Sequence, residues 1–582
     1  MGELLSVEAI EELEWTAETA KFRPVNPRWW KAQTKLKIDR ERRENRGEVL
    51  GMPSERDEPW RQALKLSEKG YTGPAGGRQS SAGLFPEARG TTAQVPGLYP
   101  WSVGAGAPIV GTPLGMHLET GSPVCYDATN WMTRGGFITA PVTMVLALNG
   151  YGKSTLVRKM VLGSIAQKRT TLMLGDAKPD YRVLTEEVGG QVVELGFGHG
   201  RLNVLDPGAM GQVLTRLSGD PDYQRAIASD VRGRQVTTVA GLIELLRGRA
   251  IDDFEVTLLA TGIELLYSDY GFTYDNPPIL EDLHALIIAG HPDLYADAGL
   301  DAPEGLTPSL SLTDRDREAE RAQGEDRRLY EEAIRPLRRS LNSLIRGELG
   351  AVFNGQSSVR LDLDAPAICV DVSLIPQSEQ KLRAAVLMAC WADGMAAVEG
   401  AHILADAGLA PKRTFHVVLD ELWQVLGAGE ALVDRVNSLT RLNRGIGTEL
   451  TLCTHSYKDA LSLSSSSARE KARGFFERAR VKIIGPIPSG EVALLRDVVE
   501  LSEREIAMVT GWATPEALTG EAARPGEKPP APPGMGKFLL KVGEGSGPGI
   551  PLQTVLTDAE VRSQIHETNA RYSHVNLAGA NS

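Results

Sequence analysis

The stretch Ala147–Thr155 reads ALNGYGKST and decides the fold class. It follows a bounded apolar run, Val142–Leu148, of the kind that forms a strand buried on both faces of a sheet. Apolar residues then recur at helical spacing from Leu156 to Val161, and Thr170–Leu174 is the next short apolar run. A strand, a turn, a helix and a second strand therefore follow one another, which predicts an α/β fold with a parallel-rich sheet.

The turn between this strand and helix has the residues of a phosphate-binding loop. Gly150 and Gly152 let the backbone N–H groups curl around an anion without a Cβ clash, and the helix N-terminus adds positive potential. Lys153 would reach the β and γ phosphates, Ser154 would ligate Mg²⁺ and Thr155 would donate to the α phosphate. The flanking strand and helix favour this interpretation over a chance GKST in a turn. The predicted nucleotide-binding residues are Asn149, Gly150, Tyr151, Gly152, Lys153, Ser154 and Thr155.

A phosphate-binding loop needs a carboxylate on a neighbouring strand. The segment Phe415–Trp423, FHVVLDELW, is an apolar strand that ends in two acids. Asp420 is predicted to hold the magnesium, and Glu421 to orient and deprotonate the attacking water. The alternative, that the two acids simply cap a helix, becomes weaker beside GKST, because each half of the site explains the other.

A third strand, Leu450–Thr454, delivers Thr454 and His455 to the same sheet edge. A polar side chain at this position can sense the γ phosphate and connect hydrolysis to movement. A surface histidine with no such role is the alternative for His455.

The rest of the chain divides by its periodicity. Residues 108–207 and 350–557 hold the strand candidates, and residues 208–349 show helical periodicity without convincing strands, which predicts an all-helical insertion. A charged stretch within the insertion predicts a solvated helix face broken at Pro336. Residues 1–107 are predicted to be a short helical region and a flexible linker, and 558–582 a polar tail. The further strand candidates are Val192–Leu195, Ala367–Val372, Val481–Ile484 and Phe538–Val542.

Composition excludes several classes of protein. The 582 residues are 42% hydrophobic and 24% charged, as in ordinary globular proteins, and the net charge of −12 gives no broad basic field for nucleic acid. The four cysteines form no CxxC pair, which favours reduced thiols in the cytosol and makes zinc improbable on spacing. The longest uncharged apolar run, Ala384–Ala392, is far below the roughly 20 residues that span a bilayer.

These motifs resemble those of the conjugative type IV secretion ATPases of the TraC class, in the HerA/FtsK superfamily of hexameric RecA-like motors. In that class the loop is followed by an Asp-Pro-Lys-Gly-Glu-Tyr-like motif, matched here by Asp176–Tyr181 (DAKPDY), and by an Asn-Pro-Leu-Asp-like element, matched by Asn203–Asp206. An Asp-Glu-Ala-Trp-like motif corresponds to Asp420–Trp423. The segment that leads into the loop, PLGMHLETGSPVCYDATNWMTRGG, resembles actinobacterial members.

The resemblance implies a cytoplasmic ATPase, peripheral at the inner face of the membrane, that hydrolyses ATP with Mg²⁺ to power conjugative transfer. It implies a homo-hexamer, secretion-channel or conjugation proteins as partners, and an arginine, Arg441 or Arg444, that acts across the subunit boundary. Two alternatives stay open: a DNA translocase or coupling protein of the same superfamily, and a non-hydrolysing ATP-binding scaffold. His455 stands where the class has glutamine, and Ala147 and Pro179 stand where it has glycine.

Overall fold

The computed structural model describes residues 9–10, 12–13, 31–39, 66–67, 70–71 and 107–566, except for 218–220, 303–324, 359, 423, 425–446, 459–465, 497, 514–531, 544 and 546. Two compact units divide the chain, Met1–Tyr99 and Pro100–Ser582. In the first unit, residues 31–39 are helical and β1 (Leu66–Ser67) pairs antiparallel with β2 (Gly70–Tyr71). All that follows concerns the second unit.

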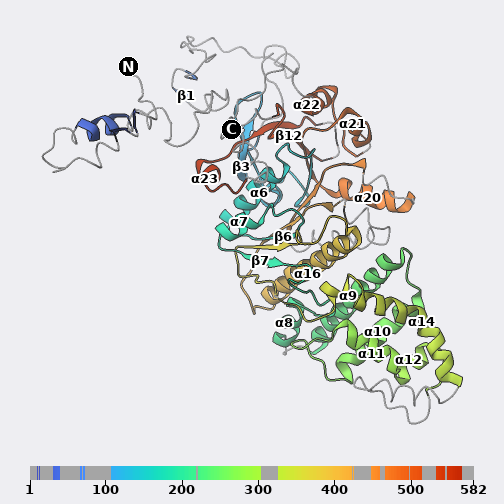
Figure 1. The fold of residues 1–582 in the computed structure, drawn as a ribbon. Helices are drawn as coiled ribbons and strands as arrows, with labels where there is room; N and C mark the ends of the chain where they lie inside the picture. Colours follow the sequence, from blue (N-terminus) through green and yellow to red (C-terminus); the bar gives the residue numbers. More distant parts are fainter. Residues whose placement is uncertain are drawn as a thin grey trace, which may run out of the picture. The chain divides into compact units, whose positions relative to one another are not determined.

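An 11-stranded sheet in the order β4-β3-β13-β12-β11-β5-β10-β9-β6-β8-β7 forms the centre of the second unit (Figure 1). The strands from β11 to β7 are all parallel, so the predicted parallel-rich α/β sheet is confirmed. These parallel strands are β5 (Val142–Leu146), β6 (Thr170–Asp176), β7 (Gln191–Glu194), β8 (Ala367–Asp371), β9 (Phe415–Leu419), β10 (Glu449–Thr454) and β11 (Val481–Ile484).

Four antiparallel strands extend the sheet beyond β11. They are β12 (Lys537–Val542), β13 (Ile550–Thr554), β3 (Thr112–His117) and β4 (Pro123–Tyr126), and the sequence patterns predicted only the first of them. This extension brings the two ends of the second unit together, because β3 lies beside β13. The parallel core therefore has one edge at β7 and is covered at β11.

Helices cover both faces of the sheet because the central strands alternate their side chains between two apolar cores. Met144 and Leu146 of β5 pack on the face that carries α16 (Gln380–Asp406), whereas Val145 packs on the face that carries α6 (Lys153–Ala166). The other helices that flank the sheet are α5 (Ala128–Thr133), α7 (Arg182–Glu187), α20 (Ser466–Arg478), α21 (Ser489–Leu495), α22 (Glu503–Ala513) and α23 (Asp558–Arg562).

Of the helices that the structure describes, α16 alone has the length and apolar composition of a membrane span, but 78% of its most apolar window is buried inside the protein. Trp391 of α16 donates its indole N–H to the carbonyl oxygen of Leu174 in β6 at 2.6 Å. The helix is therefore the central packing element on this face of the sheet.

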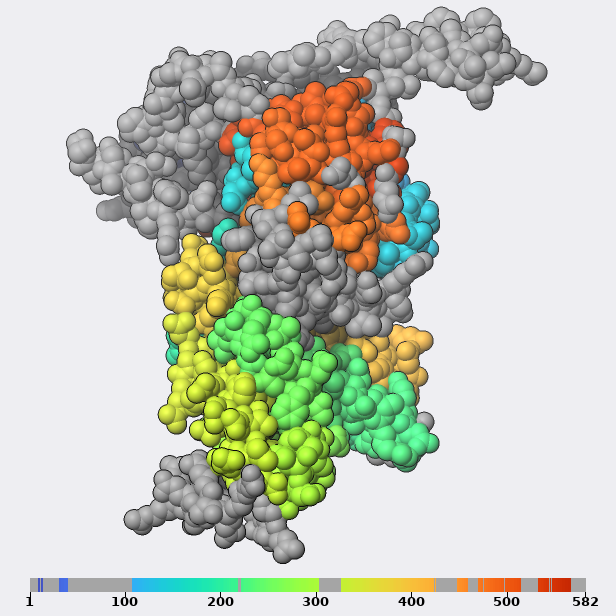
Figure 2. Space-filling model, turned by 90° about the vertical axis from the view of Figure 1, so that its right-hand side faces the viewer, coloured from blue at the N-terminus to red at the C-terminus, as the bar shows by residue number. Residues whose placement is uncertain are grey.

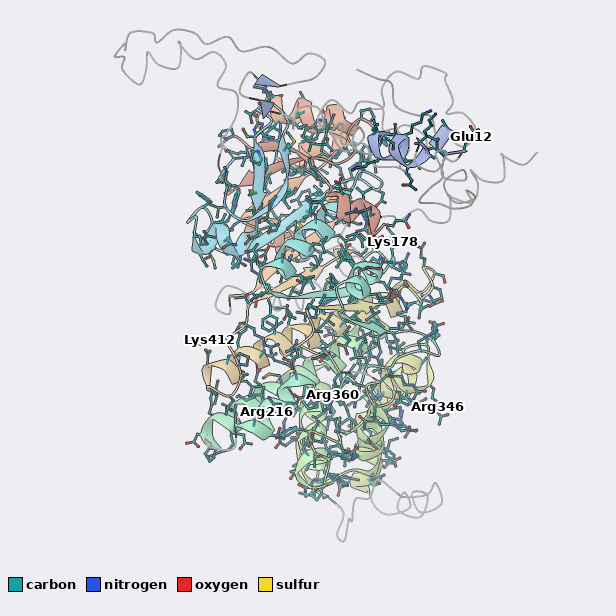
Figure 3. The ribbon with its side chains drawn as sticks, turned by 90° about the vertical axis from the view of Figure 1, so that its left-hand side faces the viewer. Glu12, Lys178, Arg216, Arg346, Arg360 and Lys412 are labelled. Atoms are coloured by element: carbon teal, nitrogen blue, oxygen red, sulfur yellow. The ribbon has the colours of Figure 1, made fainter. Side chains whose placement is uncertain are left out.

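Between β7 and β8, every element in the described residues is a helix. The bounds are α8 (Ala209–Arg216), α9 (Pro221–Arg247), α10 (Asp253–Ser268), α11 (Leu280–Ala289), α12 (Pro292–Asp297), α14 (Glu325–Arg346) and α15 (Gly350–Phe353). Figure 2 shows these helices, in green and yellow-green, gathered at one end of the unit. Arg216 and Arg346 close α8 and α14 (Figure 3), where a positive charge stabilises the negative end of the helix.

The predicted break at Pro336 is wrong, because α14 continues through this residue. A proline inside a helix costs about 3 kcal/mol. The buried face of α14 offsets that cost, since each fully buried apolar side chain contributes roughly 1.5–3 kcal/mol. The buried apolar residues of this helix are Tyr330, Ile334, Leu337, Leu341 and Leu344.

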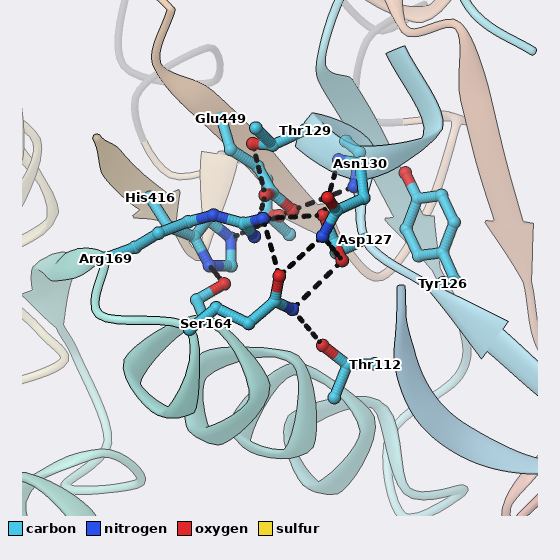
Figure 4. A network of polar contacts seen from close by, with 12 residues as sticks. Thr112, Tyr126, Asp127, Thr129, Asn130, Ser164, Arg169, His416 and Glu449 are labelled. Atoms are coloured by element: carbon cyan, nitrogen blue, oxygen red, sulfur yellow. Dashed lines mark hydrogen bonds and ion pairs between the residues drawn. The ribbon is translucent and has the colours of Figure 1, made fainter. Parts of the chain in front are cut away.

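A buried polar network joins the antiparallel extension to the parallel strands (Figure 4). The guanidinium group of Arg169 pairs with Asp127 at 2.9 Å and with Glu449 at 3.2 Å. Glu449 begins β10, so the network lies at the start of the parallel strands, and Thr129 also donates to its carboxylate at 3.0 Å. The carboxyl ends of the parallel strands lie at the opposite edge of the sheet, where the loop after β5 and the acids after β9 are found.

Candidate functional site

The loop between β5 and α6 has the backbone of a phosphate cradle. Gly150 and Gly152 have φ values of 83° and 90°, in the left-handed region that favours glycine. Gly152 is the N-cap of α6, so the first N–H groups of the helix lie directly beyond it. Asn149 and Gly150 are exposed, and Tyr151 and Gly152 are half-buried. An anion can therefore approach this loop from solvent.

Ala147, which replaces the usual first glycine, is fully buried at the end of β5. A Cβ placed on Gly485 would lie 2.6 Å from the methyl carbon of Ala147. Because Gly485 has no side chain, the methyl group of Ala147 fits beside it without displacing the loop.

Lys153 and Asp420 form a buried ion pair at the carboxyl edge of the sheet. Lys153 Nζ lies 2.8 Å from Asp420 Oδ1, and the two side chains are 5% and 9% exposed. Burial lowers the pKa of Lys153, but the negative groups around it, with Asp420 first among them, together outweigh burial and raise the pKa. Burial raises the pKa of Asp420, but Lys153 and its hydrogen bonds hold that pKa below the ordinary value. Both groups are therefore charged, and each neutralises the other.

Ser154 and Asp420 offer the oxygen ligands that Mg²⁺ prefers. The Ser154 hydroxyl donates to Asp180 Oδ2 at 2.9 Å, and the Tyr181 hydroxyl donates to Asp420 Oδ2 at 2.8 Å. Within the described ranges no group of three or more His, Cys, Asp or Glu residues could hold a metal by itself. The donor set fits a Mg²⁺ ion that completes its coordination with water and phosphate oxygens.

Glu421 is held in place by its backbone and by contacts with Lys178 and His455. Its φ of 54° is rare for a residue with a side chain, and such strain occurs most often at functional sites. Glu421 Oε1 lies 3.1 Å from Lys178 Nζ and 3.2 Å from His455 Nε2. Burial raises the pKa of Glu421, but His455 and the two lysines, Lys153 and Lys178, hold it well below the ordinary value. The carboxylate is therefore ionised and able to accept a hydrogen bond from water.

Thr454 and His455 lie at the end of β10, the strand between β5 and β9. His455 Nε2 contacts Glu421, whereas Nδ1 is buried and has no partner in the described part of the chain. Arg441 and Arg444 lie outside the described residues, as does Trp423.

The predicted residues Lys153, Ser154, Asp420, Glu421 and His455 thus form one cluster, with Thr155 in the first turn of α6. Sequence reasoning matched Asp176–Tyr181 to a motif but assigned no contact to it. The structure brings Lys178, Asp180 and Tyr181 of that segment against three of the predicted residues. The side chain of Lys178, labelled in Figure 3, is 47% exposed, whereas that of its partner Glu421 is 5% exposed.

No protein-family model matches the chain, and no curated protein does. Among solved structures, VirB4 of Thermoanaerobacter pseudethanolicus is similar with a TM-score of 0.54 and 17% identity, over 79% of this chain and 100% of that one. The bacterial conjugative coupling protein TrwB, without its first 70 residues, gives 0.42 and 12%, over 77% and 88%. The likeness to VirB4 shows that the chain has a RecA-like α/β fold.

Proposed function

We propose that this protein is a Mg²⁺-dependent ATPase. The observation that carries the proposal is the meeting of Lys153, Asp420 and Glu421 at the carboxyl edge of the parallel sheet, where β10 separates β5 from β9, beside a loop with the backbone of a phosphate cradle. Ligands of open α/β sheets bind at this edge.

The binding role belongs to the loop and to Lys153. The backbone N–H groups at the start of α6 and the Lys153 ammonium group would hold the β and γ phosphates, and Thr155 the α phosphate. Phosphate then competes with Asp420 for Lys153. The pair that is closed at 2.8 Å opens when nucleotide binds, which frees the Asp420 carboxylate for the metal.

Ser154 and Asp420 would hold Mg²⁺, which supplies positive charge to the phosphate oxygens when bound. Glu421 would orient a water molecule and accept its proton. His455, which contacts Glu421, would sense whether the γ phosphate is present and transmit this to Glu421 through their contact. Charge that develops on the transferred phosphoryl group calls for an arginine, and we assign this role to Arg441 or Arg444 of a neighbouring subunit.

The cellular role that we propose is a motor for type IV secretion or conjugative transfer, active as a hexamer at the cytoplasmic face of the membrane. The ordered motifs of the sequence and the likeness to VirB4 over 79% of the chain support it. The domain boundaries and the actinobacterial subtype remain predictions.

The test is hydrolysis of ATP by the full-length protein and three variants. Lys153→Ala should lose nucleotide binding, because the ammonium group holds the phosphates. Glu421→Gln should bind nucleotide but hydrolyse it about 10²-fold more slowly or worse, the contribution of a general base. Glu332→Gln changes an exposed glutamate of α14 and should behave like the parent.

Absence of turnover in the parent, with ATP bound, would favour the scaffold over the ATPase. Strong stimulation of turnover by double-stranded DNA would favour the DNA translocase over a motor for another cargo. Binding of ATP by Lys153→Ala as tight as in the parent would contradict the assignment of the loop.

A further inference from the structure

The segment that follows β6, Asp176–Tyr181, contacts both proposed metal ligands. Its Asp180 carboxylate accepts the hydrogen bond of the Ser154 hydroxyl at 2.9 Å, and its Tyr181 hydroxyl donates to Asp420 at 2.8 Å. Tyr181 and Asp420 are buried, whereas Ser154 and Asp180 are half-buried.

Hydrogen bonds to two buried side chains hold the backbone of this segment in place. The Asp176 carboxylate, 2% exposed, accepts the backbone N–H of Asp180 at 3.0 Å and that of Tyr181 at 2.8 Å. Arg158 of α6 donates from Nη1 to the backbone oxygen of Asp180 at 2.9 Å and is itself 2% exposed. The backbone on both sides of the Asp180 side chain is therefore fixed to buried groups.

The direction of the Ser154 hydrogen bond matters for metal binding. A hydroxyl has one proton and two lone pairs, and only a lone pair can face a cation. When the proton points at Asp180, the lone pairs of Oγ are free to face the metal. The negative carboxylate also strengthens the oxygen as a donor of electrons, as partners behind metal ligands do elsewhere.

We infer that Asp180 is a positioning residue of the magnesium site, which acts through Ser154 and not by direct ligation. This inference rests on the proposed function, since it concerns the metal of that site. It adds a residue to the site that neither the loop nor the acidic strand end contains.

The experiment measures Mg²⁺ affinity apart from turnover. Full-length protein is saturated with ADP that carries a fluorescent N-methylanthraniloyl group, and MgCl₂ is titrated while the fluorescence is followed. A parallel titration of the same ADP in EDTA gives the affinity without metal. Asp180→Ala should weaken Mg²⁺ binding by about 10- to 100-fold, as loss of such partners does, and leave the affinity in EDTA unchanged.

The double variant tests the path of the effect. If Asp180 acts through Ser154, then Ser154→Ala, Asp180→Ala should bind Mg²⁺ no more weakly than Ser154→Ala alone. Additive losses would instead make Asp180 a direct ligand and overturn the inference. Asp282→Asn is the matched control, because this carboxylate is half-buried and accepts a backbone N–H at the start of α11. It should bind Mg²⁺ like the parent.

Asp180→Asn decides the matter if the alanine variant does not fold. An amide oxygen can accept the Ser154 proton but carries no charge, so Mg²⁺ affinity should fall between those of the parent and of Ser154→Ala. An affinity equal to the parent's would overturn the inference. Failure of the proposed function looks different, because the parent itself would then show no Mg²⁺-dependent change in ADP fluorescence.

Discussion

Replacement of Lys153 by alanine should destabilise the nucleotide-free protein as well as abolish phosphate binding. The ammonium group is the cation paired with Asp420, and both side chains are at least nine-tenths buried. Removal of one partner of a buried ion pair leaves an uncompensated charge and costs about 3–5 kcal/mol. Two hydrogen bonds to Asp420 remain, one from the Tyr181 hydroxyl and one from the Glu421 backbone N–H, both at 2.8 Å. We therefore expect the lower end of the range.

The assay is thermal unfolding followed by tryptophan fluorescence in the absence of nucleotide. A loss of about 3 kcal/mol lowers the unfolding temperature by about 3 °C in a unit the size of Pro100–Ser582, since the entropy of unfolding is about 2.1 cal/mol/K per residue. Lys412→Ala removes an exposed lysine and should leave the temperature unchanged. Circular dichroism at low temperature confirms that each variant is folded.

The critical comparison is between the stability of the double variant Lys153→Ala, Asp420→Asn and that of Lys153→Ala alone. Asparagine takes the place of the buried charge, so the double variant should be more stable than Lys153→Ala. If Lys153→Ala unfolds at the temperature of the parent, or if the second substitution restores nothing, the ion pair is absent from the resting state in solution. The proposal that phosphate opens this pair would then fall with it.

Two further predictions concern other parts of the molecule. Burial, with the charge of Asp206 second, raises the pKa of Asp393 to about 7, whereas an unfolded chain ionises this group near pH 4. Stability should therefore fall as the pH rises from about 4 through 7, and Asp393→Asn should raise the free energy of unfolding by about 2 kcal/mol more at pH 8 than at pH 5, measured by urea denaturation. An equal effect at both pH values would contradict this. If Arg441 or Arg444 acts in trans, subunits with both arginines changed to alanine should regain ATP hydrolysis when mixed with excess Lys153→Ala subunits; mixed rings as inactive as the double-arginine variant would refute it.

The parallel core could be predicted from sequence because its strands are buried on both faces and read as short apolar runs. β11 has the predicted bounds, and β5 begins where predicted. Strands β3, β4 and β13 could not be predicted in this way, because segments such as TPLGMH and IPLQT include proline and have no regular alternation. They are strands because β12 offers an edge on which β13 and then β3 pair. Whether these segments form strands is therefore decided by tertiary contacts and not by their local sequence.

The predicted site residues come together because the strands that carry them are neighbours in one sheet and end at the same edge. Motifs alone indicate Lys153, Asp420 and Glu421, since their chemistry is recognisable at the end of an apolar run. The partners of these residues are another matter. Nothing in the spacing of DAKPDY tells that Asp180 reaches Ser154 or that Lys178 reaches Glu421, because each contact depends on how one loop folds over another strand's end.

Helices α10, α11, α12 and α14 and the C-terminal part of α9 share one continuous apolar core with the sheet, through α16, whereas α8 packs in a separate cluster. Leu242 of α9, Leu259 of α10 and Leu283 of α11 belong to the same core as Leu174 of β6. Helices that share a core with the sheet would turn together with it, as a lever arm. A small rotation near the nucleotide keeps its angle along the arm, and the displacement grows with distance from the pivot. The displacement would thus be greatest at the end of the unit where Figure 1 places α12 and α14.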